Sequence, residues 1–291
     1  NGNSHFGGIV GAAYGNFRIE NVHVSGSLRY GVQTAGYWLV VGGIIGQLHG
    51  TGNGIIENCS VDLDIIGNLG THGQSTGYLI GVGGLIGKAT SGGASPIIIK
   101  NCYTKGTIDV KAGLARSLNA GGLIGTVATD DTNVSTGAWQ IINCYSTMDI
   151  KAVKEGGTAA RWLLAGGLVG YFNSSNANAK IENSVALNPR VLIETVDTPT
   201  ASRAAGRITS AKHATPTFTG NYALSTMLIG DGNGAEADAN DTADGLNGVS
   251  AAAAAMDAAW WTGTLNFDPA VWDFTGLNVA GGSYPKLKSQ F

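Results

Sequence analysis

The sequence predicts an all-β protein: a right-handed parallel β-helix, or solenoid, of about five to six coils with a C-terminal cap. Two short phrases recur in pairs along most of the 291 residues, which is typical of a repeat architecture. Each copy is too short to bury a core alone, so neighbouring copies have to stack. No copy contains a convincing amphipathic helix, so helical repeats are disfavoured. Short β-strands in stacked coils account for all three observations.

The first phrase is a glycine pair, two aliphatic residues and a third glycine, and each coil is expected to start near its first glycine. These starting glycines are Gly7, Gly42, Gly83, Gly121 and Gly166, with a degenerate sixth copy near Gly206. Glycine suits positions where the backbone bends or approaches a neighbour too closely for a Cβ atom. The phrase therefore indicates architecture rather than a phosphate-binding loop.

The second phrase is a short aliphatic run that ends in asparagine. The asparagines lie 37 to 43 residues apart, at Asn21, Asn58, Asn101, Asn143, Asn183 and Asn221. Asparagine tolerates left-handed backbone and suits a corner, and stacked coils would arrange the amides in a ladder. Each coil is expected to contain three strands: one before the glycines, one at the glycine phrase, and an alternating one that starts at the asparagine phrase.

A six-bladed β-propeller is the main alternative, because about 40 residues per copy also fits one propeller blade. Kelch-type blades carry a tyrosine and a tryptophan at set offsets after paired glycines. Here Trp38, Trp139 and Trp162 do not share one repeat position. The β-helix is therefore favoured.

The three cysteines occupy one repeat position, directly after the asparagine, at Cys59, Cys102 and Cys144. In the other copies this position is assigned to Val22, Ser184 and Tyr222. Small residues at a shared position indicate an inward-facing core site, where free cysteine behaves as a compact hydrophobe. CxxC pairs are absent and the count is odd, which disfavours both a zinc site and a disulfide framework.

The repeat fades after Asn221, which divides the chain into a β-helix domain, residues 1–221, and a capping segment, residues 222–291. The second part contains an acidic, glycine-rich stretch, an alanine-rich run and several aromatic residues. Solenoids need capping segments with a polar outer face. We therefore expect this part to pack on the last coil.

Charge and hydropathy exclude several classes of function. The 17 basic and 20 acidic side chains give a net charge of −3, so nothing favours a nucleic-acid partner. No apolar run approaches the roughly 20 residues needed to span a bilayer. The sequence starts at Asn1, almost directly in a repeat phrase. A secretion signal or anchor is therefore expected outside it.

These phrases resemble the GLUG repeat of bacterial cell-surface proteins. The resemblance rests on the Gly-Gly-Leu-Ile/Val-Gly and Asn-Cys-Tyr phrases and on the aromatic ending from Trp260 to Leu287, and it covers about Gly7 to Leu287. It implies a secreted or surface-anchored β-helical protein with an adhesin-like role, and it supplies no catalytic residues. Some IgA-cleaving metallopeptidases carry the repeat beside a protease domain, but the five histidines here form no HExxH motif.

Acidic residues in the alternating strand are the candidates for catalysis. Asp64 and Asp149 lie six residues after their asparagines and Asp109 lies eight after, so stacking is expected to align all three in one column. Paired carboxylates are what glycoside hydrolysis needs. The simpler interpretation is a solvated polar face of an alternating strand.

Aromatic residues near loops are the candidates for ligand binding, because their rings can stack on sugars, although rings also fill cores. We assign this role to Tyr37, Trp38, Tyr78, Trp139 and Trp162. Calcium is the one possible cofactor, with Asp231, Asn233, Glu236 and Asp238 as ligands. The EF-hand spacing fails there, which favours a solvated loop.

The favoured hypothesis is a non-enzymatic, secreted or cell-surface, adhesin-like protein. It would bind an extracellular glycan or a host or other surface protein through one side and the loops of the solenoid. The alternative is a β-helical polysaccharide hydrolase or lyase that uses Asp64, Asp109 and Asp149. No P-loop, dinucleotide fingerprint or nucleophile elbow is present.

Overall fold

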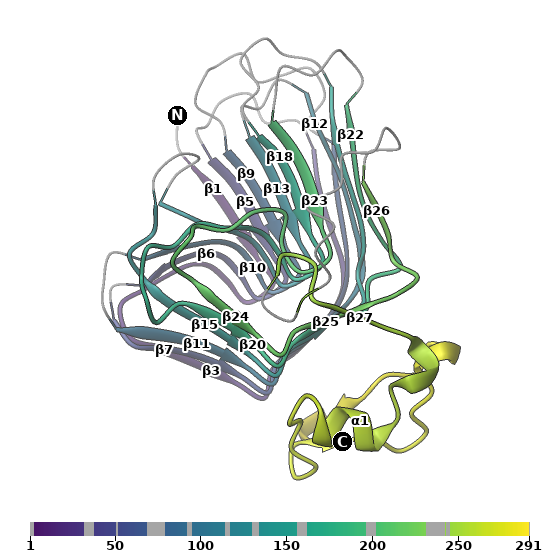
Figure 1. Ribbon diagram of the computed structural model, residues 1–291. Helices are drawn as coiled ribbons and strands as arrows, with labels where there is room; N and C mark the ends of the chain where they lie inside the picture. The colour runs from purple at the N-terminus through teal and green to yellow at the C-terminus, as the bar shows by residue number, and fades with distance from the viewer. Residues whose placement is uncertain are drawn as a thin grey trace.

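The fold was analysed in a computed structural model of the chain. It describes residues 3–31, 38–50, 52–68, 79–91, 95–113, 117–129, 134–155, 162–195, 202–230, 242 and 245–290. Strands from successive repeats stack in register into four parallel sheets, here named A to D (Figure 1). The predicted parallel β-helix is confirmed, and the propeller alternative is wrong because its blades are antiparallel sheets stacked around an axis.

The chain passes through sheets A, B, C and D in turn in each coil, although in the later coils the sheet D segment is divided into two short strands. Sheet A contains β1 (Ser4–Gly7), β5 (Trp38–Gly42), β9 (Leu79–Gly83), β13 (Ser117–Gly121), β18 (Trp162–Gly166) and β23 (Ser202–Gly206). Sheet B contains β2 (Val10–Tyr14), β6 (Ile45–Gly50), β10 (Ile86–Ser91), β14 (Ile124–Val127) and β19 (Val169–Phe172). Sheet C contains β3 (Phe17–Glu20), β7 (Gly54–Glu57), β11 (Pro96–Lys100), β15 (Ala138–Ile142), β20 (Lys180–Glu182) and β24 (Thr217–Thr219).

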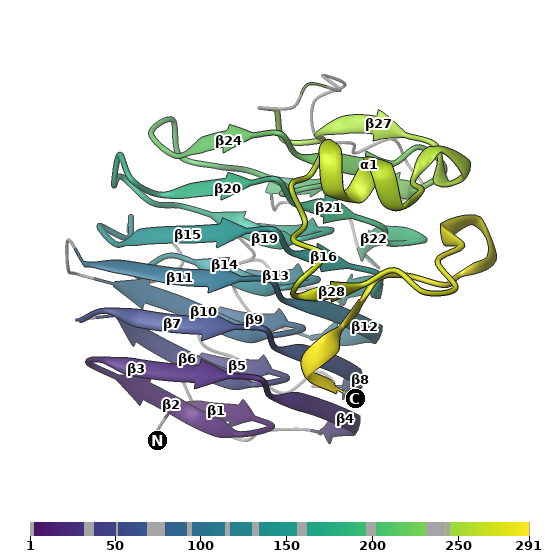
Figure 2. The ribbon, with the colours of Figure 1, turned by 90° about the horizontal axis from the view of Figure 1, so that it is seen from below.

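Sheet D is the longest and follows the asparagine corner. It contains β4 (His23–Tyr30), β8 (Ser60–Asn68), β12 (Tyr103–Ala112), β16 (Tyr145–Ser146), β17 (Asp149–Lys154), β21 (Val185–Ala186), β22 (Arg190–Thr195), β25 (Tyr222–Leu224), β26 (Leu228–Gly230) and β27 (Val249–Ala251). We call a column of residues at one register position in successive coils a ladder. The coils lie one above another from β1–β4 at one end to β24–β27 at the other (Figure 2).

The glycine phrase is a bend between two sheets, not a strand of its own. In the fourth coil, β13 ends at Gly121 and β14 starts at Ile124. A Cβ atom added to Gly122 would lie 2.1 Å from the carbonyl oxygen of Gly167 in the next coil. Only glycine permits this approach. The prediction of three strands per coil is wrong, because the strand predicted to start at the asparagine phrase is two strands, one in sheet C before the asparagine and one in sheet D after it.

The asparagine corner has the backbone conformation that the sequence predicts. The φ angles lie between +48° and +55° at Asn21, Asn58, Asn101, Asn143 and Asn183. Asparagine is one of the few residues that adopt this left-handed region readily. The corner turns the chain from sheet C into sheet D. The asparagine phrase therefore ends one strand, and the alternating strand starts only after the corner.

The degenerate sixth copy follows the same rule with its residues shifted by one position. Thr219 lies opposite Glu182 and Tyr222 opposite Val185. Gly220, with φ +64°, therefore holds the corner. Asn221 takes the place of the cysteines, and its Oδ1 accepts a hydrogen bond from the Ser184 N–H at 3.1 Å. The assignment of Tyr222 to the cysteine position is wrong by one residue.

The interior is a stack of aliphatic ladders. One ladder in sheet C consists of Ile56, Ile99, Ile141 and Ile181, all fully buried. The cysteine ladder is equally buried, and all three thiols are free. Burial raises the pKa of Cys102, which makes it an inert core residue rather than a reactive one. The predicted inward cysteine position is confirmed.

Residues 252–290, called the tail below, leave the stack and lie along the outer face of sheet D. The tail contains η1 (Ala253–Ala255), α1 (Ala258–Gly263), β28 (Trp272–Asp273), η2 (Val279–Gly281), β29 (Lys286–Leu287) and η3 (Lys288–Gln290), and β28 pairs with β29 in antiparallel fashion. Its contacts start at the last coil and continue back to the early coils (Figure 2). Whether it closes the end of the stack stays a prediction.

Candidate functional site

The outer face of sheet D carries an aromatic ladder where each strand leaves the asparagine corner. This ladder consists of His23, Ser60, Tyr103, Tyr145, Val185 and Tyr222. The rings of Tyr103 and Tyr145 stack with centroids 5.0 Å apart and planes within 2°. That separation matches the roughly 4.8 Å spacing of paired strands, so the register itself stacks the rings.

The tail packs its aromatic residues on this ladder. The ring centroid of Tyr145 lies 5.6 Å from that of Trp261 and 5.7 Å from that of Trp272. Both tryptophans are almost fully buried. Two polar bonds fix the arrangement: the Asn143 Nδ2 donates to the carbonyl of Asn266 at 2.6 Å, and the Tyr145 hydroxyl donates to the carbonyl of Pro285. Burial raises the pKa of Tyr145 well above its ordinary value.

A pocket of about 540 Å³ lies between the tail and sheet D, and we call it the tail pocket. Its lining is unusually mixed, with three tyrosines, charged residues of both signs, amides and hydroxyls. The lining residues are Asn21, His23, Asp62, Tyr103, Lys105, Tyr145, Thr147, Gly282, Ser283, Tyr284, Pro285, Lys286, Ser289 and Gln290. Sheet D forms its floor and residues 282–290 form its wall.

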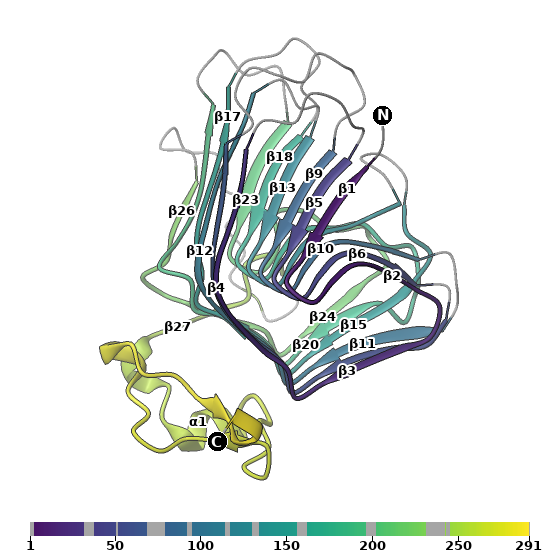
Figure 3. The same ribbon diagram turned by 180° about the vertical axis from the view of Figure 1, so that it is seen from behind.

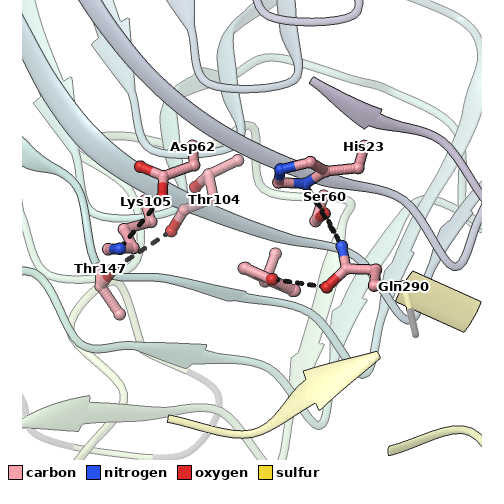
Figure 4. Close-up of polar contacts among 8 residues, drawn as sticks. His23, Ser60, Asp62, Thr104, Lys105, Thr147 and Gln290 are labelled. Atoms are coloured by element: carbon pink, nitrogen blue, oxygen red, sulfur yellow. Dashed lines mark hydrogen bonds and ion pairs between the residues drawn. The ribbon is translucent and has the colours of Figure 1, made fainter. Parts of the chain in front are cut away.

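One end of the tail pocket is held by Gln290 (Figure 4). Its Nε2 donates to the Oγ of Ser60, and its Oε1 accepts from the Tyr103 hydroxyl at 2.9 Å. The same Ser60 Oγ lies 2.7 Å from Nδ1 of His23. Ser60 is fully buried, so its hydroxyl organises this corner and cannot act as a nucleophile toward a molecule in the pocket.

The other end of the pocket is charged. Lys105 Nζ lies 3.0 Å from Asp62 Oδ2 in the neighbouring coil, and both side chains remain substantially exposed (Figure 4). The hydroxyl of Thr147 donates to the carbonyl of Thr104 at 3.4 Å. An exposed ion pair adds little stability, so these two groups remain able to exchange partners with a ligand. The pocket thus offers aromatic surface, donors and acceptors, the groups with which proteins bind polar organic molecules.

The predicted acidic column is only partly formed. Asp64 and Asp149 both lie opposite Thr107, so they share one ladder and are separated by about two strand spacings, roughly 10 Å. Asp109 lies opposite Lys151 and Ile66 in a neighbouring ladder. The single column is therefore wrong for Asp109, because the strands pair without an insertion and a residue eight after its asparagine lies two positions further along the strand than Asp64 and Asp149.

The acids of the shared ladder already have partners. The Thr107 hydroxyl donates to Asp64 at 2.8 Å, and the guanidinium of Arg190 pairs with Asp149. The catalytic role of these acids stays a prediction.

The predicted ligand-binding aromatics do not gather at the tail pocket. Trp139 is fully buried, and its Nε1 donates to the Ser135 hydroxyl at 3.1 Å, so it fills the core rather than facing a ligand. Trp38 and Trp162 are half-buried in sheet A. Tyr37 and Tyr78 lie outside the described residues, as do the proposed calcium ligands Asp231, Asn233, Glu236 and Asp238.

The residues of the tail pocket were missed by sequence reasoning. A signal was present, since Tyr103 and Tyr145 follow the cysteines at one repeat position while a tail rich in tryptophan comes later in the chain. Outward-facing aromatic residues at a repeat position need a covering partner. Nothing in the period of the repeat, however, says which side of the stack the tail covers.

One segment of the chain matches a known protein-family model. Residues 2–29 carry a GLUG motif. This motif spans the described part of the first coil, including its glycine bend and its asparagine corner. No curated protein matches the chain, and no solved structure matches it. The GLUG motif together with the stacked register makes this a GLUG-motif parallel β-solenoid.

Two further findings concern the described residues. None of their helices is long and apolar enough to cross a membrane. Within the same part of the chain, His, Cys, Asp and Glu side chains form no group of three or more that could hold a metal ion.

Proposed function

We propose that this GLUG-motif solenoid is a non-enzymatic, adhesin-like protein that binds an extracellular glycan in the tail pocket. The observation that carries the proposal is the lining of that pocket, in which three tyrosines alternate with amide, hydroxyl and charged groups. Tyrosine combines a flat apolar ring with a polar tip. A sugar needs both kinds of contact, because its ring face is apolar and its edge is hydroxylated.

The geometry supports binding more than hydrolysis. Asp62 in the pocket is paired with Lys105, and elsewhere on sheet D Asp64 is bonded to Thr107 and Asp149 to Arg190. Hydrolysis of a glycosidic bond needs two cooperating carboxyl groups roughly 5–10 Å apart around the bond. The described pocket lining contributes one carboxylate. Mixed donors and acceptors on a preformed surface are sufficient for recognition.

A glycan array followed by calorimetric titration of the best hit tests this function. Tyr284→Ala should weaken binding about five- to tenfold, because it removes one stacking ring and its hydroxyl. Lys151→Ala is the matched control. Lys151 lies on sheet D, and its Nζ is 3.0 Å from Glu194 Oε1. It does not line the pocket, so its removal should leave glycan binding unchanged. Release of shortened glycan products, or equal affinity of Tyr284→Ala and wild type, would contradict the proposal.

Secretion to the cell surface is part of the same proposal, and its support is the GLUG motif. The check is protease treatment of intact cells that produce the full-length protein. The proposal requires fragments to be released while a cytoplasmic marker stays intact.

A further inference from the structure

The floor and the wall of the tail pocket each carry a cation. Lys105 lies in β12 on the floor, and Lys286 lies in β29 of the tail. The side chain of Lys105 is 58% exposed, and Lys286 is also exposed. Figure 3 shows the tail outside the stack, next to sheet D. The two lysines therefore reach the pocket from separate parts of the chain.

Acidic groups of the pocket compensate these cations only in part. Asp62 is the one carboxylate among the described lining residues, and its Oδ2 lies 3.0 Å from Lys105 Nζ. Two lysines and one aspartate leave the described lining with one positive charge in excess, apart from any protonation of His23. The pocket thus attracts a negatively charged molecule.

An acid outside the lining, Asp273, does not remove this excess. It lies opposite Lys286 in the β28–β29 pair. Hydrogen bonds from Thr275 are the largest cause that lowers the pKa of Asp273, and the charges of Lys288 and Lys286 lower it further. One carboxylate is therefore shared between two lysines of the tail, so it neutralises Lys286 only in part.

Lys105 keeps donors for a ligand. An ammonium group has three N–H donors, and the bond to Asp62 uses one of them. Burial raises the pKa of Tyr284, and the charge of Lys105 opposes that rise, so the ammonium on the floor and the phenol on the wall face the same space. An anion in that space accepts from both groups. Such charge-assisted hydrogen bonds are roughly twice as strong as neutral ones.

The rest of the lining indicates what carries the negative charge. Hydroxyl and amide groups of Thr147, Ser283, Ser289 and Gln290 line the same pocket, and they suit a hydroxylated ring. The pocket volume of about 540 Å³ falls within the range of roughly 300–1,000 Å³ that is typical of small-ligand sites. One negative charge matches the excess, whereas a doubly charged phosphate would be repelled more strongly by Asp62. A sugar with a carboxylate fits these conditions.

We propose that the tail pocket selects a glycan with a carboxylate, as in a uronic acid or sialic acid unit, and that it holds this carboxylate between Lys105 and Lys286. The inference rests on the proposed function, since it names the class of glycan bound at the same site. Asp62 has a regulating part in the selection, because it competes with the ligand for the ammonium of Lys105.

Calorimetric titration of the whole chain with matched acidic and neutral glycans tests the selection. The pairs are trigalacturonate with its methyl ester, and sialyllactose with lactose. At least one acidic member should bind about tenfold more tightly than its neutral counterpart. This ratio should fall as sodium chloride is added, because salt screens exposed charges.

The outcomes separate this inference from the proposed function. Binding of neutral glycans with no preference for their acidic counterparts overturns the selection and leaves the proposed function standing. Absence of binding to every glycan, on the array and in the titrations, overturns both. A preference for sulfated or phosphorylated glycans over carboxylated ones contradicts the assigned anion.

Charge-removing variants locate the preference in the pocket. Lys105→Gln should lower the ratio of acidic to neutral affinity about five- to tenfold, because it replaces a charge-assisted bond by a neutral one. Asp62→Asn should raise the ratio about two- to threefold, since the competing carboxylate is lost. Lys151→Gln is the matched control, because it removes a lysine of sheet D that lies outside the lining. Equal losses in Lys105→Gln and Lys151→Gln would assign the preference to the overall charge of sheet D and overturn the proposal.

Discussion

The interior of the solenoid and the core under the tail are built by different rules. In the solenoid, isoleucine stands above isoleucine in ladders such as Ile56, Ile99 and Ile141, and each side chain meets a copy of itself. Under the tail, Trp261, Phe267 and Trp272 pack on one another and on the ladder residue Tyr145, and none of the three tail residues stands above a copy of itself. The first core is specified by register and the second by particular side-chain pairs. A single substitution should therefore act differently in the two places.

The largest expected effect comes from removing a ring of the tail core. Trp261→Ala should destabilise the packing of the tail by about 3–5 kcal/mol, because the indole is fully buried and no copy exists to replace it. We expect limited proteolysis to cut residues 252–290 under conditions in which the solenoid stays intact. The matched variant is Ile99→Ala, which should instead lower the melting temperature of the solenoid. If both variants cause one common loss of structure, the two cores are a single cooperative unit.

A smaller effect is expected at the asparagine corner. Asn101→Ala should destabilise the solenoid by about 1–2 kcal/mol, since alanine disfavours the left-handed backbone found at φ +51°. The substitution also removes the 3.2 Å hydrogen bond from Asn101 Nδ2 to Asn58 Oδ1. Asn101→Gly keeps the backbone conformation and loses only that bond, so it should cost less in chemical denaturation. Equal losses of stability in Asn101→Ala and Asn101→Gly would show that the side-chain hydrogen bond to Asn58, and not the left-handed backbone, determines the stability of the corner.

The smallest effect is a pH dependence carried by the half-buried histidines of the first two coils. Burial, followed by the charge of Lys88, lowers the pKa of His49 and also that of His5. The unfolded chain then binds more protons than the native state near pH 6, so stability is fully present above about pH 6.5 and decreases as the pH falls. Melting should therefore shift downward between about pH 7.5 and about pH 5. His49→Gln should flatten this shift, and an unchanged slope would contradict the assignment.

The same contrast explains what the sequence could predict. The repeating coil could be predicted from the glycine and asparagine phrases, because each of these two residue types occupies a corner whose backbone few other residues tolerate. Gly122 permits a backbone contact and Asn101 permits a left-handed corner. The number of strands per coil was underestimated, since the asparagine corner, for example Asn101, divides what was predicted as one alternating strand into a strand of sheet C and a strand of sheet D.

The candidate sites were harder to predict because they depend on how strands, sheets and the tail are placed against one another, which the spacing of the repeat does not give. Asp64, Asp109 and Asp149 look equivalent by counting, but strand register places Asp109 in another ladder. The tail pocket requires the tail to return to Ser60 and Tyr103, and no local pattern encodes that return. Trp38 and Trp162 were identified as candidates, but their position between two sheets depends on how sheet A folds back on sheet B.

The contact of Gln290 with Ser60 has a mechanical consequence. A repeat array normally frays from its ends, because a terminal coil is held by one neighbour only. Here the chain leaves the last coil and its final residues reach the strands of the first two, through His23 and Ser60. If the two ends of the stack were pulled apart, the contacts of the tail with sheet D would have to break before the first coil could separate from the second. The tail thus acts as a tether in parallel with the stack, and it couples the first two described coils to the last one.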